Sequence, residues 1–164
     1  MRGTRHDAIF IGLLVEQSHQ KQLEECGFDG YYTYFASDGF TYGSTTDKWR
    51  SLALHAKAHG KLFIPSVGPG YIDVSVRPWN ARNTKQRQHG QYYRNSWSAA
   101  LQCAPSIVSV TSFNEWHEGT QIESAVPKMT SDGSYLDYSP DKPDFYLQLT
   151  RQFVDRFSQS SSGR

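Results

Sequence analysis

Short apolar segments alternate with segments of helical character along most of the chain. The apolar segments span residues 7–15, 30–35, 61–67 and 107–110, and the helical ones span residues 16–26, 47–59, 90–103 and 145–157. Continuous apolar runs of this length are typical of parallel strands that are covered on both faces. Strand–helix alternation predicts parallel βαβ units with right-handed crossovers, and hence an α/β fold over residues 1–157. The polar, serine-rich segment 158–164 is predicted to be disordered.

The loops that follow the predicted strands carry more chemically useful side chains than the loops that precede them. This asymmetry is typical of a (β/α)8 or TIM barrel, whose active site is built from the loops at the carboxyl ends of its strands. Eight units close such a barrel in about 250 residues. The 164 residues of this chain therefore accommodate about four units, a half-barrel. A doubly wound open sheet is the alternative, although no glycine fingerprint for a dinucleotide follows any predicted strand.

The last predicted strand runs directly into two carboxylates, Glu115 and Glu118, with Trp116 between them. Carboxylic acids are seldom placed at the end of a core strand unless they are paired or functional. Glycoside hydrolysis uses two carboxyl groups, one for the leaving-group proton and one that helps to form the new bond at the anomeric carbon. The sequence therefore favours a glycosidase site here. The alternative is a polar loop whose glutamates form salt bridges with lysine or arginine.

Composition excludes several other classes of protein. The net charge of +1 and the lack of a basic run give no electrostatic basis for nucleic-acid binding. No run of about 18 apolar residues and no signal-peptide pattern is present, so no membrane segment is predicted. Cys26 and Cys103 are too few for a disulfide framework, and free thiols are the favoured interpretation over a single disulfide bond.

The sequence HEGTQ at 117–121 invites comparison with the zinc motif HExxH. Gln121 occupies the fifth position, and the segment leaves a strand and contains a glycine, so the helical geometry of that motif is not expected. The acidic loop 123–144 does not have the spacing of a calcium loop and is predicted to be solvated, with Tyr135 and Tyr138 packed beneath it. A metal held by Glu115, His117, Glu118 and Glu123 is thus a distant alternative. We predict neither a metal nor a cofactor.

Three residues on the strand-exit loops suit an oxygen-rich ligand. Arg77 lies in a proline-bounded loop, where its guanidinium can donate to such a ligand or form an ion pair with Asp73. Tyr34 and Tyr71 follow the second and third strands, where each phenol either reaches the site or packs at the edge of the core.

Four motifs together resemble the endo-α-1,2-mannosidases of glycoside hydrolase family 99. They are FNEWHEGTQIE at 113–123, FIPSVGPGYID at 63–73, RPWN at 77–80 and GFDGYYTYFAS at 27–37, and the resemblance extends over about residues 7–157. It is greatest to the animal Golgi enzymes and their endomannosidase-like paralogue. The resemblance implies a (β/α)8 barrel that cleaves glucosylated high-mannose N-glycans in the Golgi, with this chain as the carboxyl-terminal half of the barrel.

The resemblance also implies roles for individual residues. Glu115 matches the base that takes the proton of the substrate's own 2-hydroxyl, in a retaining reaction through a 1,2-anhydro sugar. Glu118 matches the general acid/base that protonates the departing oxygen and then activates water. The residues expected to contact substrate are Asn114, Tyr34, Arg77, Trp79, Tyr71, Trp116 and His117.

From this resemblance we expect the chain to lack the membrane anchor, the stem and the first half of the barrel. A parallel half-barrel leaves two open sheet edges, which favours pairing with the other half or aggregation. The alternative function is therefore a truncated, catalytically inactive product that binds at most a glycan or a partner.

Overall fold

A computed structural model of the protein describes residues 2–131 and 133–162. The first part of the chain forms β1 (Ile11–Leu13), α1 (His19–Glu25), β2 (Gly30–Tyr32), α2 (Thr46–Ala58), β3 (Leu62–Ile64) and β4 (Ser66–Val67). Then follow the 3₁₀ helices η1 (Pro78–Asn83) and η2 (Gln88–Gly90), and α3 (Gln91–Gln102), β5 (Ser109–Val110), β6 (Lys128–Thr130), β7 (Gly133–Tyr135) and α4 (Phe145–Ser162).

The strands that precede helices pair in parallel, which confirms the predicted βα units. β1, β2 and β3 form one parallel sheet, and β4 and β5 form a second parallel pair. β3 and β4 belong to one extended segment that Pro65 divides. Proline has no N–H to donate to a strand ladder, so the segment pairs with β2 before it and with β5 after it. The carboxyl ends of all these strands consequently lie on one side of the molecule, where the strand-exit loops gather.

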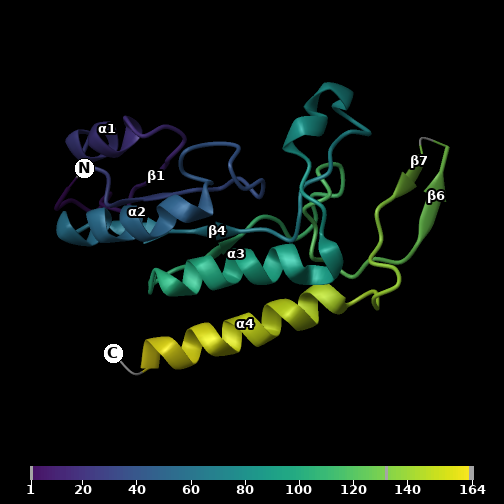
Figure 1. The fold of residues 1–164 in the computed structure, drawn as a ribbon. Coiled ribbons are helices and arrows are strands. Elements are labelled where there is room, and N and C mark those ends of the chain that lie inside the picture. The colour runs from purple at the N-terminus through teal and green to yellow at the C-terminus, as the bar shows by residue number, and fades with distance from the viewer. Residues whose placement is uncertain (1, 132, 163–164) are drawn as a thin grey trace.

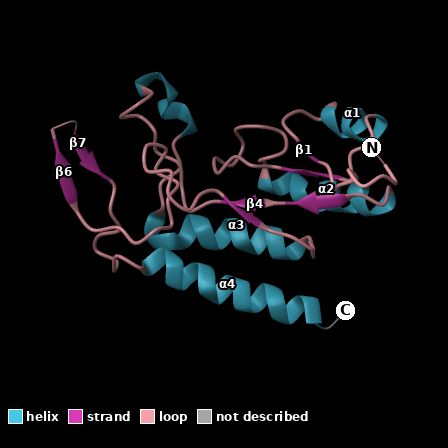
Figure 2. Ribbon diagram, turned by 180° about the vertical axis from the view of Figure 1, so that it is seen from behind, coloured by secondary structure: helices cyan, strands magenta, loops and turns pink. Residues whose placement is uncertain are grey.

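Aromatic packing joins α3 to α4, which lie side by side in Figures 1 and 2. The Trp97 indole stacks on the Phe153 ring at 5.3 Å between centroids and 2° between planes. Tyr93 is fully buried and contacts the rings of Tyr146 and Phe153. Gly90 lies where α3 begins, and a β-carbon there would come within 2.8 Å of the Phe145 ring. The close approach of the two helices therefore requires a glycine at this position.

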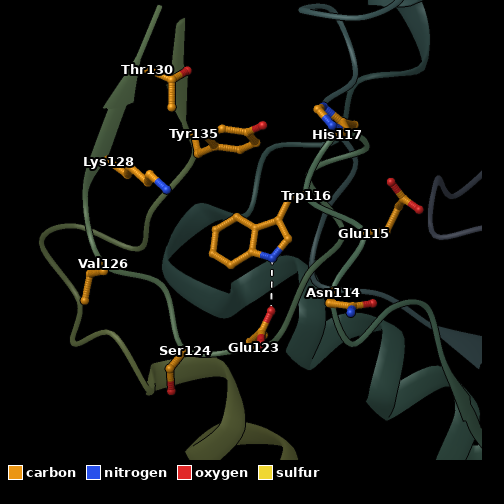
Figure 3. Close-up of a pocket in the computed structure, with 10 residues that line it drawn as sticks. All are labelled: Asn114, Glu115, Trp116, His117, Glu123, Ser124, Val126, Lys128, Thr130 and Tyr135. Atoms are coloured by element: carbon orange, nitrogen blue, oxygen red, sulfur yellow. Dashed lines mark hydrogen bonds between the residues drawn. The ribbon is translucent and has the colours of Figure 1, made fainter. Parts of the chain in front are cut away.

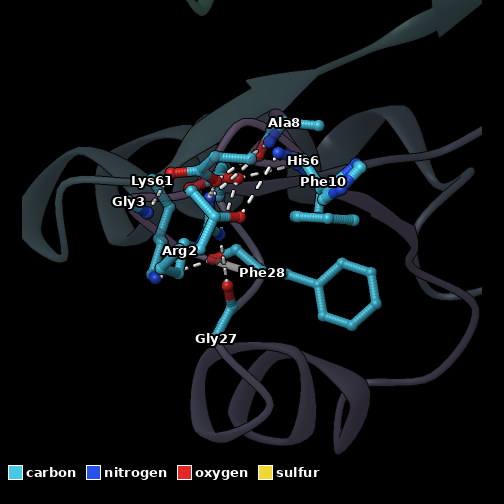
Figure 4. A network of polar contacts seen from close by, with 11 residues as sticks. Arg2, Gly3, His6, Ala8, Phe10, Gly27, Phe28 and Lys61 are labelled. Atoms are coloured by element: carbon cyan, nitrogen blue, oxygen red, sulfur yellow. Dashed lines mark hydrogen bonds and ion pairs between the residues drawn. The ribbon is translucent and has the colours of Figure 1, made fainter.

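A polar network holds the amino-terminal segment against β1 (Figure 4). The Arg2 guanidinium pairs with Asp7 at 3.3 Å and with Asp29 at 2.8 Å. It also donates to the carbonyl oxygens of Ala8 and Gly27. Asp29 in turn accepts a hydrogen bond from the backbone N–H of Phe10, so one carboxylate connects the segments before β1 and before β2.

The acidic loop 123–144 contains a structured hairpin that the sequence analysis missed. β6 and β7 pair in antiparallel register, with Lys128 opposite Tyr135. The signal was present, because an Asp-Gly pair between two short strands is typical of a hairpin turn; Asp132 itself lies outside the described residues. Tyr138 packs beneath the loop as predicted and is 4% exposed, but Tyr135 is exposed at the hairpin.

The last helix is longer than the sequence predicted. α4 continues through Ser162, so residues 158–162, which composition predicted to be disordered, extend the helix, and residues 163–164 lie outside the described part. Ser158 and Ser160 donate to the carbonyl oxygens of Val154 and Phe157. Adding a residue to a packed helix costs little once the helix has formed, so local composition underestimates its length. Within the described residues no helix has the length and apolar character that a membrane crossing requires.

Candidate active site

The loop after β5 carries both candidate glutamates and is closed by its own backbone. Ser112 N–H donates to Thr120 O at 2.9 Å, and Glu123 N–H donates to Phe113 O at 2.9 Å, so the two arms of the loop are joined. The Ser112 hydroxyl oxygen accepts the N–H of Glu115 at 3.0 Å. These contacts hold residues 113–119 above the end of the strand as a defined loop.

Gly119 fixes where this loop meets the neighbouring one. Its φ is +61°, and a β-carbon there would lie 2.9 Å from Ile72 O. In the same place Ile72 N–H donates to Glu118 O at 2.8 Å. Only glycine combines this left-handed conformation with so close an approach. The glycine of the HEGT sequence is therefore explained by the packing of two strand-exit loops.

The Glu118 carboxylate is held by an arginine from the loop after β4. Arg77 Nη1 lies 3.0 Å from Glu118 Oε1 and 3.1 Å from Asp73 Oδ2. The Glu118 side chain is 25% exposed, the Asp73 side chain is fully buried, and the Arg77 side chain is 42% exposed. Hydrogen bonds to Asp73 and then to Glu118 raise the pKa of Arg77. Arg77 thus forms the predicted ion pair with Asp73 and at the same time contacts Glu118 at the candidate site.

The buried Asp73 carboxylate holds the side chains around Arg77 in place. Its Oδ2 accepts hydrogen bonds from the Tyr71 hydroxyl at 2.9 Å and from Asn80 Nδ2 at 2.9 Å, in addition to the contact with Arg77. Burial raises the pKa of the Asp73 carboxyl, but the hydrogen bonds from Asn80, Tyr71 and Arg77 outweigh it and leave the pKa lowered. Burial, together with the bond to Asp73 and the charge of Glu118, raises the pKa of Tyr71 to about 12, so its phenol remains protonated.

A cavity of about 290 Å³ lies beside Glu118. Aromatic side chains dominate its lining, which consists of Tyr34, Phe35, Ser37, Phe40, Tyr71, Arg77, Trp79, Asn80 and Glu118. Trp79 is 80% exposed, which is unusual for so large an apolar ring. An exposed indole beside polar donors offers a surface on which the C–H face of a sugar can stack. The cavity thus combines a carboxylate, an arginine and aromatic faces from three different loops.

Tyr34 is held in a conformation that is rare for a tyrosine. Its φ is +56°, and its backbone is bonded on both sides, with its N–H to Ser66 Oγ at 2.8 Å and its carbonyl to Thr111 Oγ1 at 2.5 Å. Such residues persist only where the surroundings hold them, and they concentrate at functional sites. Burial, followed by the charges of Glu118 and Glu115, raises the pKa of the Tyr34 phenol, so the phenol stays protonated and can donate a hydrogen bond.

A second and larger cavity, of about 650 Å³, lies between the glutamate loop and the hairpin. Glu115 is among its lining residues, but its carboxylate points to the side of the loop away from Trp116 and Tyr135 (Figure 3). The cavity is lined by Asn114, Glu115, Trp116, His117, Glu123, Ser124, Val126, Lys128, Thr130 and Tyr135. Trp116 Nε1 donates to Glu123 Oε2 at 3.0 Å, and the Tyr135 ring contacts both Trp116 and His117. The Trp116 indole is therefore fixed as one wall of this cavity.

Comparison with known proteins identifies the family. Residues 1–159 match the family model described as glycosyl hydrolase family 99. The chain belongs to this family. It is 55% identical over 159 residues to the glycoprotein endo-alpha-1,2-mannosidase of Mus musculus, and 54% identical over 157 residues to the human glycoprotein endo-alpha-1,2-mannosidase-like protein. The alignments cover 97% and 96% of this chain but 34% of each relative, so the chain spans about a third of their length.

The family 99 chain also matches solved structures of its family. The GH99 endo-alpha-mannosidase from Bacteroides thetaiotaomicron superposes with a TM-score of 0.95 at 50% identity, covering all of this chain and 51% of the bacterial one. The fold is therefore that of a family of TIM-barrel enzymes.

The structure separates the predicted site residues into two groups, one on each side of the glutamate loop. Tyr34, Tyr71, Arg77, Trp79 and Glu118 line the smaller cavity, and Asn114, Glu115, Trp116 and His117 line the larger one. Phe35 and Phe40 after β2, and Lys128 on the hairpin, also line these cavities but were not predicted from the sequence. The aromatic residues directly after β2 were a usable signal. The lysine was not predictable, because the hairpin itself was missed.

Proposed function

We propose that residues 1–164 carry the catalytic carboxylates of a retaining endo-α-1,2-mannosidase that acts on glucosylated high-mannose N-glycans. The observation that best supports it is the pair Glu115 and Glu118, which lies on one closed loop at the carboxyl end of β5, where each residue contributes to the lining of a cavity. The names of the relatives, glycoprotein endo-alpha-1,2-mannosidase among them, agree with this substrate class.

In the first step Glu115 takes the proton from the 2-hydroxyl of the mannose whose linkage is cut. The freed oxygen forms a bond to C1 of the same sugar, and the bond from C1 to the departing glycosidic oxygen breaks. Glu118 gives its proton to that oxygen. The step ends with a 1,2-anhydro sugar, a protonated Glu115, an ionised Glu118 and the free remainder of the glycan.

In the second step Glu118 takes a proton from water, whose oxygen attacks C1. The bond between C1 and O2 breaks, and Glu115 returns its proton to O2. Two displacements at C1, each with inversion, give net retention and restore both carboxyl groups. When Glu118 carries the proton its charge pairing with Arg77 is lost, and Asp73 remains as the charged partner of the guanidinium.

The other side chains of the two cavities position the glycan substrate. Tyr34 donates to a sugar oxygen or to a carboxylate, and Tyr71, whose proton goes to Asp73, accepts from a sugar hydroxyl. Trp79 stacks on a sugar face, and Arg77 faces the departing oxygen. Asn114, Trp116 and His117 line the larger cavity, where they contact the sugars on the Glu115 side.

We also propose that this chain forms one part of a closed barrel. Within the described residues β1 pairs only with β2, and β5 pairs only with β4, so each leaves one edge of its sheet open. Ile9, Ile107 and Phe113 are 71%, 46% and 56% exposed near those edges. Four further βα units would cover both edges and close the barrel. The alternative, a catalytically inactive form that binds glycan or pairs with the other half-barrel, rests on the same open edges. Residence in the Golgi is proposed from the family resemblance.

The test is the release of disaccharide from a glucosylated high-mannose glycan by the full-length protein that contains this chain. Glu118→Gln and Glu115→Gln should each abolish most turnover, while Glu25→Gln, which changes an exposed glutamate paired with Lys21 on α1, should leave it unchanged. Equal turnover in the wild type and the Glu118→Gln variant would exclude the enzyme. Expressing residues 1–164 alone decides the alternative: glycan binding without turnover would support the inactive form.

A further inference from the structure

The sequence predicted no metal, but the fold brings together three ligand-type side chains from two helices, and we propose that Glu24, His55 and His59 form a zinc site that joins α1 to α2. Glu24 lies near the end of α1, His55 lies in the last turn of α2, and His59 is the residue directly after α2. One ligand atom from each side chain lies within 4.8 Å of the others, and in the described part of the chain this is the one group of three or more such residues that gathers in this way. The proposal is independent of the proposed catalytic function.

The hydrogen bonds around the two imidazoles suit metal binding. His59 Nδ1 lies 2.8 Å from the backbone carbonyl oxygen of His55, which can only accept a hydrogen bond. Nδ1 of His59 must therefore carry the hydrogen, which leaves the lone pair on Nε2 available as a ligand. His55 Nε2 faces Glu24 Oε1 at 2.7 Å, so the hydrogen between them is the proton that an incoming metal displaces.

The geometry is close to what zinc requires. Bonds of about 2.0 to 2.2 Å in a tetrahedron place ligand atoms roughly 3.3 Å apart. The His55–Glu24 pair at 2.7 Å has to open slightly, and the His59 imidazole has to move inward. That movement is feasible because His59 is exposed and its ring already stacks against that of His55 at 4.1 Å between centroids. Two imidazoles and one carboxylate suit zinc, with water as the fourth ligand.

The location indicates a structural role. α1 has only seven residues, none of them is fully buried, and its contact with the core is made by the partly buried Leu23, so packing supports it less than α2. A metal held by Glu24 from α1 and by both histidines from α2 would tie this helix to its better-packed neighbour. His55 and His59 lie at the end of α2 that leads into β3, which is the end of the units opposite to the glutamate loop. The proposed zinc is thus separate from the catalytic carboxylates.

A second histidine–carboxylate pair serves as the matched control. His89 Nδ1 lies 2.9 Å from Asp141 Oδ2, much as His55 lies beside Glu24, but among the described residues no third ligand joins it. Removing His89 eliminates an imidazole paired with a carboxylate without touching the proposed site. It therefore separates specific zinc binding from adventitious binding by exposed histidines.

The experiment is calorimetric titration of the metal-free, full-length protein with zinc chloride at pH 7.5. We expect one zinc per chain with micromolar affinity, at least about tenfold weaker binding in His59→Gln and in Glu24→Gln, and wild-type affinity in His89→Gln. Hydrogen exchange supplies a second measurement: zinc should slow amide exchange in α1 of the wild type but not of His59→Gln, whose exposed side chain is not needed for folding. Absence of saturable binding, or unchanged affinity in both His59→Gln and Glu24→Gln, would overturn the proposal.

Discussion

Glu115 and Glu118 lie on the same loop, but their surroundings differ. The Glu118 side chain is mostly covered and is held by Arg77, which is fixed in turn by the buried Asp73. Glu115 is exposed, and within the described residues its carboxylate makes no hydrogen bond or ion pair. The protein therefore positions one carboxylate and leaves the other open to solvent and ligand. This difference fits the proposed roles, since Glu118 acts on two successive oxygens at one place whereas Glu115 needs a substrate hydroxyl to complete its contacts.

The largest expected effect is on turnover. Glu115→Gln and Glu118→Gln in the full-length protein should each lower turnover by about 10² to 10⁴, because a positioned acid or base contributes on that order. The double variant should be little worse than either single one, since the two groups act as a unit. Single-turnover kinetics would measure all three. Multiplicative losses in the double variant would show that the glutamates work separately.

The next largest effect is expected on stability, at the buried Asp73 that fixes Arg77 beside Glu118. Asp73→Asn removes the charge that three donors share, and we expect a loss of about 2 kcal/mol in the free energy of unfolding. Asp155→Asn is the matched control, because Asp155 also pairs with an arginine four residues away, Arg151, but on the exposed face of α4. It should cost less than about 0.5 kcal/mol. Urea unfolding measures both, and equal losses would mean that Asp73 does not anchor the Glu118 side.

The lowered pKa of Asp73 also predicts how the stability of the protein changes at acid pH. The pKa of Asp73 is lowered in the folded protein, so its contribution to stability is present above its unfolded pKa of about 3.9 and is lost as the pH falls through the lower, folded value. The difference in unfolding midpoint between the wild type and Asp73→Asn should therefore be constant at neutral pH and shrink below about pH 4. Thermal unfolding at a series of pH values checks this. A difference that grows on acidification would contradict the assigned direction.

A smaller effect is expected where the glutamate loop meets its neighbour. Gly119→Ala places a β-carbon 2.9 Å from Ile72 O at a residue whose φ is +61°. Gly39 also has a left-handed conformation, with a φ of +80°, but a β-carbon there would have no atom within 4 Å. The left-handed conformation alone costs an alanine about 1 to 2 kcal/mol. Gly119→Ala should therefore lose more stability than Gly39→Ala, and the difference measures the contact with Ile72. Equal losses would show that the loop shifts without cost.

The smallest effect on stability is expected at the rim of the smaller cavity. Trp79 is 80% exposed, so Trp79→Ala should change the free energy of unfolding by less than about 0.5 kcal/mol. By contrast, Trp97→Ala, at a residue that is 2% exposed, should cost about 3 to 5 kcal/mol. If Trp79 stacks on a sugar, its removal raises KM for the glycan. An unchanged KM would remove Trp79 from the substrate contacts.

Local patterns predicted the order of the elements and singled out Glu115 and Glu118 as candidate site residues, whereas their proposed roles came from the family resemblance. Apolar runs and helical periodicity located the parallel strands and the helices, because these patterns follow from which faces are buried. The glutamates were recognisable because carboxylates at the end of a core strand are costly without a role. The hairpin and the last turns of α4 were missed, since a short polar hairpin has little periodicity and the helix end is extended from an already packed helix.

Only the tertiary structure decided how these residues are grouped. Arg77 and Glu118 are 41 residues apart in the chain, and the single guanidinium between Glu118 and Asp73 could not be inferred from spacing. The division of the predicted residues between two cavities, and the gathering of Glu24 with His55 and His59, likewise depend on how loops and helices from different units pack. The physical reason is that side-chain chemistry is local, whereas distances between side chains on separate elements are set by the packing of the whole fold.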